Sequence, residues 1–324
     1  MRIEAQATQR PVTAVVVTYQ SEPTLDAMFA GARRCFDEGL LDLVVVDNGS
    51  RDGTAAKLEA ESHWARTHLT GTNNGFGVGC NIGAAGAQSP YLLFLNPDAS
   101  LEPGELRKLL AFIDANPKVG IVGPATVCGG SGEPPSYQVT GPLATPRSVL
   151  LSSIPIVRSR AVAKPREILP GEAPFRTGWV CGAVLLIRRE LFTRLGGFDP
   201  RFFLYWEETD LCRRVEDAGF EVWVTGNSLA RHIAGASSVE DGTRIGGCIG
   251  KHFYQSRRHY LIKHHGWLGA TLAELGEFAM LALQTAFDRL RGRPATRMLP
   301  RLQAALFSQP AIDPRQAAST NPSG

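Results

Sequence analysis

Short runs of β-branched and aliphatic residues, each ending in a polar turn, constrain the fold of this chain more than any other feature. Val12 to Thr18 is one such run, and Leu41 to Val46 is a second that ends at Asp47-Asn48-Gly49-Ser50. Runs of this length and composition predict strands of a parallel sheet that are buried on both faces. The segments Thr24 to Gly39 and Thr54 to Thr67 have the apolar spacing of helices. The order strand, helix, strand, helix predicts an α/β fold.

The same alternation continues further along the chain. Tyr91 to Leu95 and Val119 to Val122 predict strands, and Pro103 to about Ala115 predicts a helix between them. We therefore expect an open, mostly parallel sheet with helices on both faces. Ligands bind such sheets beyond the carboxyl ends of the strands, so we expect the functional residues there.

The second half of the chain begins with an irregular stretch. Residues 126 to 176 are rich in Gly, Pro and Ser, which predicts a long excursion with a mobile loop. Trp179 to Ile187 then predicts a strand, Arg189 to Leu195 a short helix, and Glu207 to Ala218 a longer helix. Val222 to Val224 predicts one more strand.

The C-terminal part is both more basic and more apolar than the rest. Lys251 to Arg301 contains nine Lys or Arg and three Asp or Glu, a net charge of +6, whereas the whole chain carries +3. Residues 268 to 290 predict a helix, but Glu274 and Glu277 interrupt its apolar character, so a membrane span is not expected. We expect this helix to lie on a membrane or to pair with another chain.

Composition argues against several other classes of protein. The six cysteines include no CxxC pair, which argues against a zinc site or a secreted disulfide framework. The apolar run near the N-terminus is too short for a signal peptide core, so we expect a cytoplasmic protein, with peripheral contact at the inner face of the cell membrane as an additional option. The net charge is too small to indicate nucleic-acid binding.

The glycine-rich stretch GFGVGCNIG, residues 75 to 83, does not have the spacing of a dinucleotide-binding loop. The pattern G-x-G-x-x-G would need glycine at Cys80 or at Ile82. No Walker sequence ending in Gly-Lys-Ser/Thr is present either. Nicotinamide and P-loop chemistry are therefore not expected.

In RFFLYWEETDLCRR, residues 201 to 214, three carboxylates directly follow an aromatic run. Acids in the first turn of a helix complement its positive end. A carboxyl beside apolar rings also loses hydration, so its pKa rises and it becomes a proton acceptor near neutral pH. Both interpretations of Glu207, Glu208 and Asp210 stay open on this segment alone.

Five segments in order give the chain a resemblance to a known family. It resembles the family 2 glycosyltransferases, which have a GT-A fold, and in particular their bacterial rhamnosyltransferase-like branch. The similarity covers most of residues 12 to 265. The segments are VVVTY (15 to 19), VVVDNGSRDGT (44 to 54), NNGFGVGCNIG (73 to 83), LLFLNPD (92 to 98) and GGFDPRFFLYWEETDLCRR (196 to 214).

The resemblance implies a division of the chain. We expect a glycosyltransferase domain over residues 1 to 265, in which 12 to 125 form the nucleotide-binding half and 126 to 265 the acceptor and catalytic half. Residues 266 to 310 are expected to form a helical, basic extension. Residues 311 to 324 are expected to form a flexible tail.

The resemblance also implies where a nucleotide sugar binds. Asp47 is similar to an acid that accepts a hydrogen bond from the N3–H of a uracil or thymine ring, although it also suits a turn in Asp-Asn-Gly-Ser. Thr18 and Tyr19 would line the same base pocket. The residues expected near the ribose and diphosphate, where glycine permits close backbone approach, are Asn74, Gly75, Phe76 and Asn81.

Asn96-Pro97-Asp98 is similar to the Asp-x-Asp metal motif of the family. Asp98 would give a charged oxygen ligand to Mg²⁺ or Mn²⁺, whereas Asn96 stands where many relatives have an acid. The same residues also suit a turn between a strand and a helix. His232 resembles a late histidine that approaches the metal and diphosphate, although a lone histidine is more often structural.

In similar enzymes a Glu-Asp or Asp-Asp pair supplies the catalytic base, and here the pair reads Glu207-Glu208. We expect Glu208 to be the base, with Glu207 as the alternative because the side chain at 208 is longer than in relatives. On a helix, Asp210 shares a face with Glu207 and is expected to pair with Arg213 or Arg214.

Aromatic residues near these acids would form the acceptor side, because sugars stack their apolar faces on rings. Core packing is an equal alternative for Phe202 and Phe203. The alternating basic and aromatic residues of Lys251 to His265 suit an acceptor diphosphate, anionic lipid headgroups or a solvated basic helix. The expected acceptor residues are Trp179, Gly197, Phe198, Tyr205 and Trp206.

Taken as a whole, the resemblance implies an inverting, metal-dependent hexosyltransferase of cell-surface polysaccharide synthesis. The expected donor is dTDP-L-rhamnose or a UDP-sugar, and the expected acceptor is a lipid-linked sugar or an oligosaccharide. A homodimer through the C-terminal helix is a further expectation. The alternatives are a sugar-nucleotide pyrophosphorylase, which is a nucleotidyltransferase, and a non-catalytic scaffold that binds sugar nucleotides.

Overall fold

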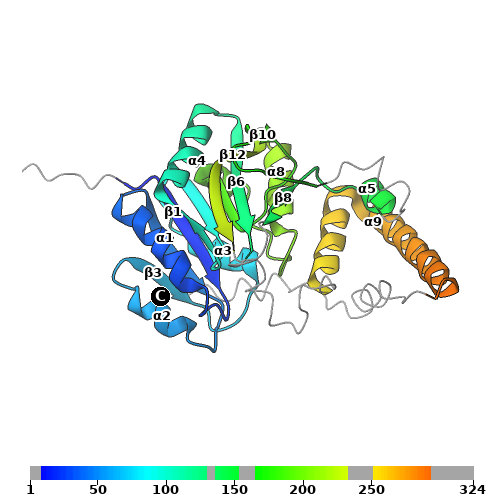
Figure 1. The fold of residues 1–324 in the computed structure, drawn as a ribbon, viewed down its shortest axis with the longest axis horizontal. Helices are drawn as coiled ribbons and strands as arrows, with labels where there is room; N and C mark the ends of the chain where they lie inside the picture. The colour runs from blue at the N-terminus through cyan, green and yellow to red at the C-terminus, as the bar shows by residue number, and fades with distance from the viewer. Residues whose placement is uncertain (1–8, 130–135, 153–164, 233–250, 293–324) are drawn as a thin grey trace, which may run out of the picture.

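The computed structural model describes residues 9–129, 136–152, 165–232 and 251–292 (Figure 1). The elements of the first half are β1 (Val12–Thr18), α1 (Leu25–Asp37), β2 (Leu41–Asp47), α2 (Thr54–Ala60), β3 (Ala65–Leu69), α3 (Phe76–Ala84), β4 (Tyr91–Leu95), β5 (Ala99–Leu101), α4 (Pro103–Ala115) and β6 (Val119–Cys128). Those of the second half are β7 (Ser136–Tyr137), β8 (Val139–Thr140), α5 (Pro146–Ser152), β9 (Arg166–Glu167), β10 (Phe175–Arg176), β11 (Val184–Arg188), α7 (Arg189–Arg194), α8 (Glu207–Asp217), β12 (Glu221–His232) and α9 (Lys251–Leu290).

The central sheet has the strand order β10-β12-β6-β11-β4-β1-β2-β3. β1 pairs in parallel with β2 and β4, and Thr18 lies level with Asp47. β11 runs antiparallel between β4 and β6, so the sheet is mixed although its first half is parallel. The carboxyl ends of β1, β2 and β4 share one edge of the sheet, which brings their polar turns together.

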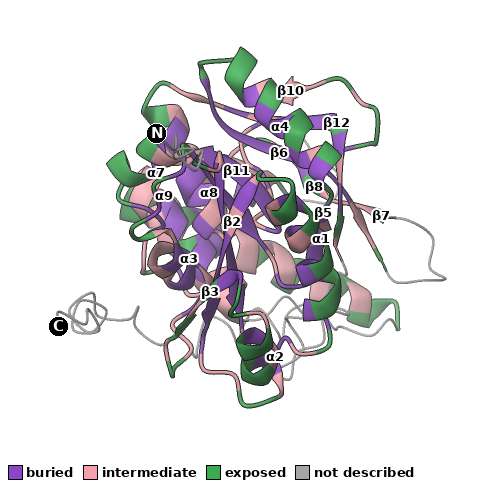
Figure 2. Ribbon diagram, turned by 90° about the vertical axis from the view of Figure 1, so that its left-hand side faces the viewer, coloured by how far each residue is buried: buried purple, intermediate pink, exposed green. Residues whose placement is uncertain are grey.

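Helices cover both faces of the sheet, as the sequence predicts. Alternate residues of β1 point to opposite faces: Ala14 and Val16 pack with α1 and α4, whereas Val15 and Val17 pack with α3, α7 and α8. Figure 2 shows the strands buried and the outer sides of helices such as α2 exposed. These two cores fix the sheet edge that carries the functional residues.

One predicted helix is wrong in its second half. The spacing predicts a helix over Thr54 to Thr67, but α2 ends at Ala60 and β3 follows. In β3 only Ala65 is buried, because this strand lies at the edge of the sheet. Such a short, polar strand carries too little apolar periodicity to be distinguished from a helix end.

Other strands differ from prediction in their bounds. β11 starts at Val184 instead of Trp179, and β6 continues to Cys128 instead of Val122. β12 continues to His232, so this histidine ends a strand and does not follow one. The extensions of β6 and β12 pair with each other in parallel, and that pairing explains their length.

The irregular stretch 126 to 176 contains β7 to β10 and α5, while residues 130–135 and 153–164 of the predicted mobile loop lie outside the described residues. α9 consists of two helices that meet at Gly266, where φ is 81° and the backbone is not helical, so the helix predicted over 268 to 290 is the second of these. Residues 293 to 310 of the predicted extension and the predicted tail 311 to 324 also lie outside the described residues. No helix in the described ranges is long and apolar enough to cross a membrane.

Candidate active site

A cavity of about 140 Å³ lies at the carboxyl ends of β1, β2 and β4. Its walls come from these strand ends, from the start of α3 and from the aromatic segment before α8. Five residues of the predicted nucleotide-sugar site line it, namely Thr18, Tyr19, Gly75, Phe76 and Asn96. The sheet topology thus gathers turns that are far apart in the sequence around one hollow.

Asp47 lies behind this cavity and is buried, with its carboxylate already engaged. Oδ1 accepts a hydrogen bond from the Thr18 hydroxyl at 3.0 Å, and Oδ2 accepts one from the Ser50 backbone N–H at 3.0 Å. The second contact is the turn arrangement that Asp-Asn-Gly-Ser suits on its own. The neighbouring Asn48 does line the cavity, and its amide donates to the Gly75 carbonyl at 3.0 Å.

Gly75 is required where the loop before α3 meets the aromatic segment. Its φ is 85°, and a Cβ there would lie 2.3 Å from the Phe203 carbonyl oxygen. The Phe76 backbone N–H donates to the same oxygen at 3.0 Å. Glycine therefore permits a close approach of two backbone segments, which ties the wall of the cavity to the segment that precedes Glu207.

Asn74 and Asn81 lie outside the cavity lining. The Asn74 amide donates to the Thr72 carbonyl at 3.1 Å. Asn81 donates to the Phe198 carbonyl and accepts from the Phe198 backbone N–H, both at 2.8 Å. Both ends of the Asn81 amide are therefore used to hold α3 against the loop before α8, and we omit this residue from the proposed donor site.

Asp98 and His232, the two predicted metal ligands, lie side by side. His232 Nε2 is 3.0 Å from Asp98 Oδ1, and Asn96 Nδ2 is 3.4 Å from the same ring nitrogen. Burial lowers the pKa of His232, but the hydrogen bonds with Asp98 and Cys128 outweigh it and raise that pKa to about 9. Apart from the ion pair, the buried Asp98 Oδ1 has no hydrogen-bonding partner among the described residues.

Glu207 and Glu208 begin α8 and occupy different surroundings. Glu207 is buried against α3, where a Cβ added to Gly77 would lie 3.7 Å from the Glu207 Cβ. Burial and the charge of Glu208 raise the pKa of Glu207 well above its usual range. Burial raises the pKa of Glu208 to about 7, although backbone N–H groups at the helix start oppose that change.

A second cavity, of about 360 Å³, has Glu208 in its wall. Trp179, Tyr205 and Trp206, three of the predicted acceptor residues, line it together with residues of α5 and α9. Within the described part of the chain, Glu208 Oε2, Trp206 Nε1 and Arg257 Nε are buried without a hydrogen-bonding partner. An apolar cavity with two unused donors and one unused acceptor suits a ligand that combines hydroxyl or phosphate oxygens with apolar surface.

The backbone before Glu207 is strained. Tyr205 and Trp206 have φ values of 68° and 71°, in the left-handed region that bulky residues rarely adopt. This turn directs both rings toward the second cavity. Of the other predicted acceptor residues, Phe198 is buried among Phe76, Phe94 and Phe192, and a Cβ on Gly197 would lie 2.4 Å from Asn81 Oδ1. These two residues belong to the core and not to a binding surface.

The two cavities are separated by a thin wall. The Asn96 backbone N–H donates to the Ala183 carbonyl at 2.9 Å. A Cβ on the adjacent Gly182 would lie 3.5 Å from the Phe76 ring and 3.8 Å from Glu208 Cβ. Glu208 and the Asn96-Pro97-Asp98 turn are therefore linked by a short run of contacts at one end of the sheet.

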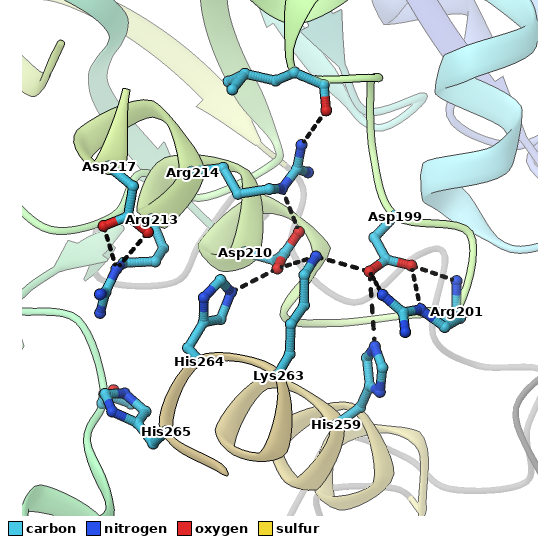
Figure 3. Close-up of polar contacts among 12 residues, drawn as sticks. Asp199, Arg201, Asp210, Arg213, Arg214, Asp217, His259, Lys263, His264 and His265 are labelled. Carbon is cyan, nitrogen blue, oxygen red and sulfur yellow. Dashed lines mark hydrogen bonds and ion pairs between the residues drawn. The ribbon is translucent and has the colours of Figure 1, made fainter. Parts of the chain in front are cut away.

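A buried ionic cluster attaches α8 to α9 (Figure 3). Asp210 is fully buried and meets Arg214 at 2.8 Å, Lys263 at 2.7 Å and His264 at 2.8 Å. Lys263 also reaches Asp199 at 2.7 Å, and the predicted pairing of Asp210 with an arginine is confirmed for Arg214. Burial raises the pKa of Asp210, but His264, Arg214 and Lys263 outweigh it and hold that pKa below its usual range.

With this geometry established, the comparisons with known proteins decide the family. The model of the glycosyl transferase family 2 matches residues 13–194. The chain belongs to this family. It is a glycosyltransferase, and this membership favours transfer over the pyrophosphorylase and scaffold alternatives.

Two relatives illustrate the similarity. The N-acetylglucosaminyl-diphospho-decaprenol L-rhamnosyltransferase of Mycobacterium tuberculosis is 29% identical over 80% of this chain and 86% of its own length. The rhamnosyltransferase WbbL of Escherichia coli is 26% identical over 61% of this chain and 75% of its own length.

Solved structures of similar fold include S. aureus TarS 1-349, with a TM-score of 0.53 and 17% identity over 91% of this chain and 77% of that one. The Pyrobaculum calidifontis mannosyltransferase PcManGT, in complex with GDP-Man and Mn²⁺, has a TM-score of 0.53 and 19% identity over 94% and 83%. Both support the GT-A fold.

Several cavity residues are absent from the sequence-based prediction. Asn48, Asn73 and Ser21 line the first cavity, and Arg257 and Phe253 line the second. Asn48 lies in the segment VVVDNGSRDGT and Asn73 in NNGFGVGCNIG, so the family resemblance could have indicated both residues. Arg257 lies in α9, beyond the family match, and only the basic and aromatic pattern of Lys251 to His265 pointed to it.

Proposed function

We propose that this glycosyltransferase transfers a hexose, L-rhamnose from dTDP-L-rhamnose, to a lipid-linked sugar in cell-surface polysaccharide synthesis. The observation that carries the proposal is Glu208, a carboxyl of raised pKa in the wall of an apolar cavity next to the strand ends. The rhamnosyl donor and the lipid-linked acceptor are supported by the names of the relatives from M. tuberculosis and E. coli.

The first cavity is the proposed site of the nucleotide sugar. Thr18, Tyr19 and Asn48 would surround the base, and Gly75 and Phe76 at the start of α3 would approach the diphosphate. Asp47 would act mainly by holding Thr18 and the Ser50 turn in place, since both of its oxygens accept hydrogen bonds there. Oδ1 accepts hydrogen bonds from the Thr18 and Ser50 hydroxyls, so only Oδ2, which accepts one from the Ser50 backbone N–H, keeps a lone pair for the base N3–H.

Asp98 and His232 are the proposed protein ligands of a divalent cation, Mg²⁺ or Mn²⁺. Asp98 Oδ1 lies 3.0 Å from His232 Nε2 and has no further partner among the described residues, which suits a cation whose remaining ligands come from a diphosphate. Within the described residues no group of three His, Cys, Asp or Glu gathers as a metal site. The bound cation would offset negative charge on the leaving nucleoside diphosphate.

Glu208 is the proposed base of a single displacement that inverts the sugar carbon. Its carboxylate would take the proton of an acceptor hydroxyl in the second cavity while that oxygen attacks the sugar. Burial and the charge of Glu208 raise the pKa of Glu207 well above its usual range, which favours the neutral form of Glu207 beside an ionised Glu208. Trp179, Tyr205 and Trp206 would stack on the acceptor sugar and exclude water from it.

A transfer assay tests this proposal. The purified chain is given dTDP-L-rhamnose or a UDP-hexose with Mg²⁺ or Mn²⁺ and a short-chain alkyl-diphosphate acceptor sugar, and nucleoside diphosphate and glycosylated product are measured. We expect both products from dTDP-L-rhamnose. Pyrophosphate release would assign the pyrophosphorylase chemistry instead, and donor binding without either product would assign a scaffold.

A further inference from the structure

The second half of α9 carries an apolar surface that faces away from the protein. This surface, which we call the outer stripe, consists of five leucines, namely Leu268, Leu272, Leu275, Leu283 and Leu290. These leucines are between 58% and 87% exposed. At 100° per residue they fall within about 80° of one another around the helix. Figure 1 shows this half of α9 next to α5, away from the sheet.

The acidic side chains of this half of α9 lie on the other side of the helix. Glu274 and Glu277 pair with Arg258 and Arg257 of the first half of α9. By the same helical rotation, Asp288 also lies opposite the outer stripe. One flank of the helix, beside the outer stripe, packs on α5, where a Cβ on Gly276 would meet the Leu150 side chain at 2.3 Å. The outer stripe is therefore apolar without acidic interruption.

We infer that the outer stripe docks α9 on an anionic lipid bilayer, and this inference rests on the proposed function for its purpose. From Leu268 to Leu290 the stripe repeats about every 3.7 residues, as on a straight helix lying on a flat surface, whereas a coiled-coil seam repeats every 3.5. Trp267, 64% exposed, directly precedes the first leucine of the stripe in sequence, and the exposed Arg289 precedes its last leucine and lies about 40° from Leu275 around the helix. Tryptophan and arginine at the ends of an apolar face suit the lipid headgroup region.

The position of the stripe explains why such docking would serve catalysis. The first half of α9 contributes Phe253 and Arg257 to the cavity that contains Glu208, and α5 contributes Ser148, Val149 and Ser152. The outer stripe belongs to the same helix, and the second half of that helix packs on the same α5. A bilayer at the stripe would hold a lipid-linked acceptor near the cavity that receives its sugar.

The experiment compares the wild-type chain with Leu272→Glu/Leu275→Glu in sedimentation with vesicles. A matched control is Leu69→Glu, because Leu69 is 65% exposed and lies in the opposite edge strand β3. We expect wild type and Leu69→Glu to bind vesicles of phosphatidylglycerol and phosphatidylcholine, more weakly at high salt. The double variant should bind at least about ten-fold more weakly, since two leucines lose their burial.

Several outcomes would overturn the inference. They are wild-type protein that binds no vesicles, a double variant that binds as well as wild type, and a wild-type dimer that the double variant converts to a monomer in light scattering. Transfer to the short-chain acceptor is measured in the same preparations, and we expect the double variant to retain it. Vesicle binding without any transfer would contradict the proposed function and leave the docking surface standing.

Discussion

Glu207 and Glu208 are neighbours in sequence, but only Glu208 lines the second cavity. We predict that Glu208→Gln lowers kcat by about 10²–10⁴-fold, the usual contribution of a general base, and leaves the Kd of the donor unchanged. Glu207→Gln is the matched control and should keep kcat within about ten-fold of wild type. Steady-state kinetics and donor titration measure both values. If Glu207→Gln were inactive and Glu208→Gln active, the base would be assigned to Glu207 instead.

The raised pKa of Glu208 predicts a pH profile. The base must be ionised, so kcat/KM should rise with pH, reach half of its plateau near pH 7 and stay level above it. The profile is measured with saturating metal and a fixed short-chain acceptor. A midpoint near the ordinary value of a glutamate, about 4.3, would show that burial does not affect the reacting carboxyl.

The same pKa predicts a stability difference. Below the unfolded pKa both states hold the proton, and as pH rises toward about 7 the folded state keeps it longer, so the free energy of unfolding falls over that window. Glu208→Gln should therefore be more stable than wild type above pH 7, by on the order of 1–3 kcal/mol, and equal to it in acid. Chemical denaturation at pH 8 and pH 4 measures the difference. Equal stability at both pH values would contradict the prediction.

The sequence motifs predicted which residues gather at the strand ends better than they predicted what each side chain contacts. Thr18, Tyr19, Gly75 and Phe76 do line a cavity, because strand ends and a glycine turn are local features. Asn81 does not line the cavity, and its motif does not reveal that its amide makes hydrogen bonds with a distant backbone segment at Phe198.

At the scale of elements, two consecutive arginines of α8 make different ion pairs. Arg214 meets the fully buried Asp210, whereas Arg213 meets the exposed Asp217. We predict that Arg214→Gln lowers the free energy of unfolding by about 2–4 kcal/mol, because a buried charge loses a partner. Arg213→Gln should cost less than about 1 kcal/mol. Urea denaturation compares them, and equal losses would show that the buried cluster does not hold α8.

The local sequence pattern predicted correctly those helices and strands whose bounds do not depend on contacts with distant segments. β1 and α4 have the predicted bounds, because a β-branched run and a helix that starts at proline can both be recognised from the sequence alone. β3 was missed because its identity depends on pairing with β2. The packing of the first half of α9 on α8 depends on contacts such as that of Lys263 with Asp210, which join segments more than fifty residues apart and so leave no local pattern.

For the whole molecule, the donor site predicts a ligand effect on thermal stability. A donor at about one hundred times its Kd adds about 2.7 kcal/mol to the free energy of unfolding, which should raise Tm by several degrees. The rise should need Mg²⁺ or Mn²⁺ and disappear with a chelator. Asp98→Asn should lose the metal-dependent part, whereas Asp217→Asn, on the exposed side of α8, should keep it. An identical rise in the presence of chelator would exclude Asp98 as a metal ligand.

Gly266 divides α9 between two neighbours that lie in different directions. Before Gly266, the helix packs on α8, which carries Glu208, through the ion pair of Lys263 with Asp210. After Gly266, the leucines of the outer stripe are exposed. A φ of 81° is a bend that a residue with a side chain adopts only under strain. The angle between the cavity that contains Glu208 and the proposed lipid surface thus depends on Gly266 alone. A bulkier residue at this position would disfavour the bend, so that the two halves of α9 could not keep both the packing on α8 and the orientation of the outer stripe.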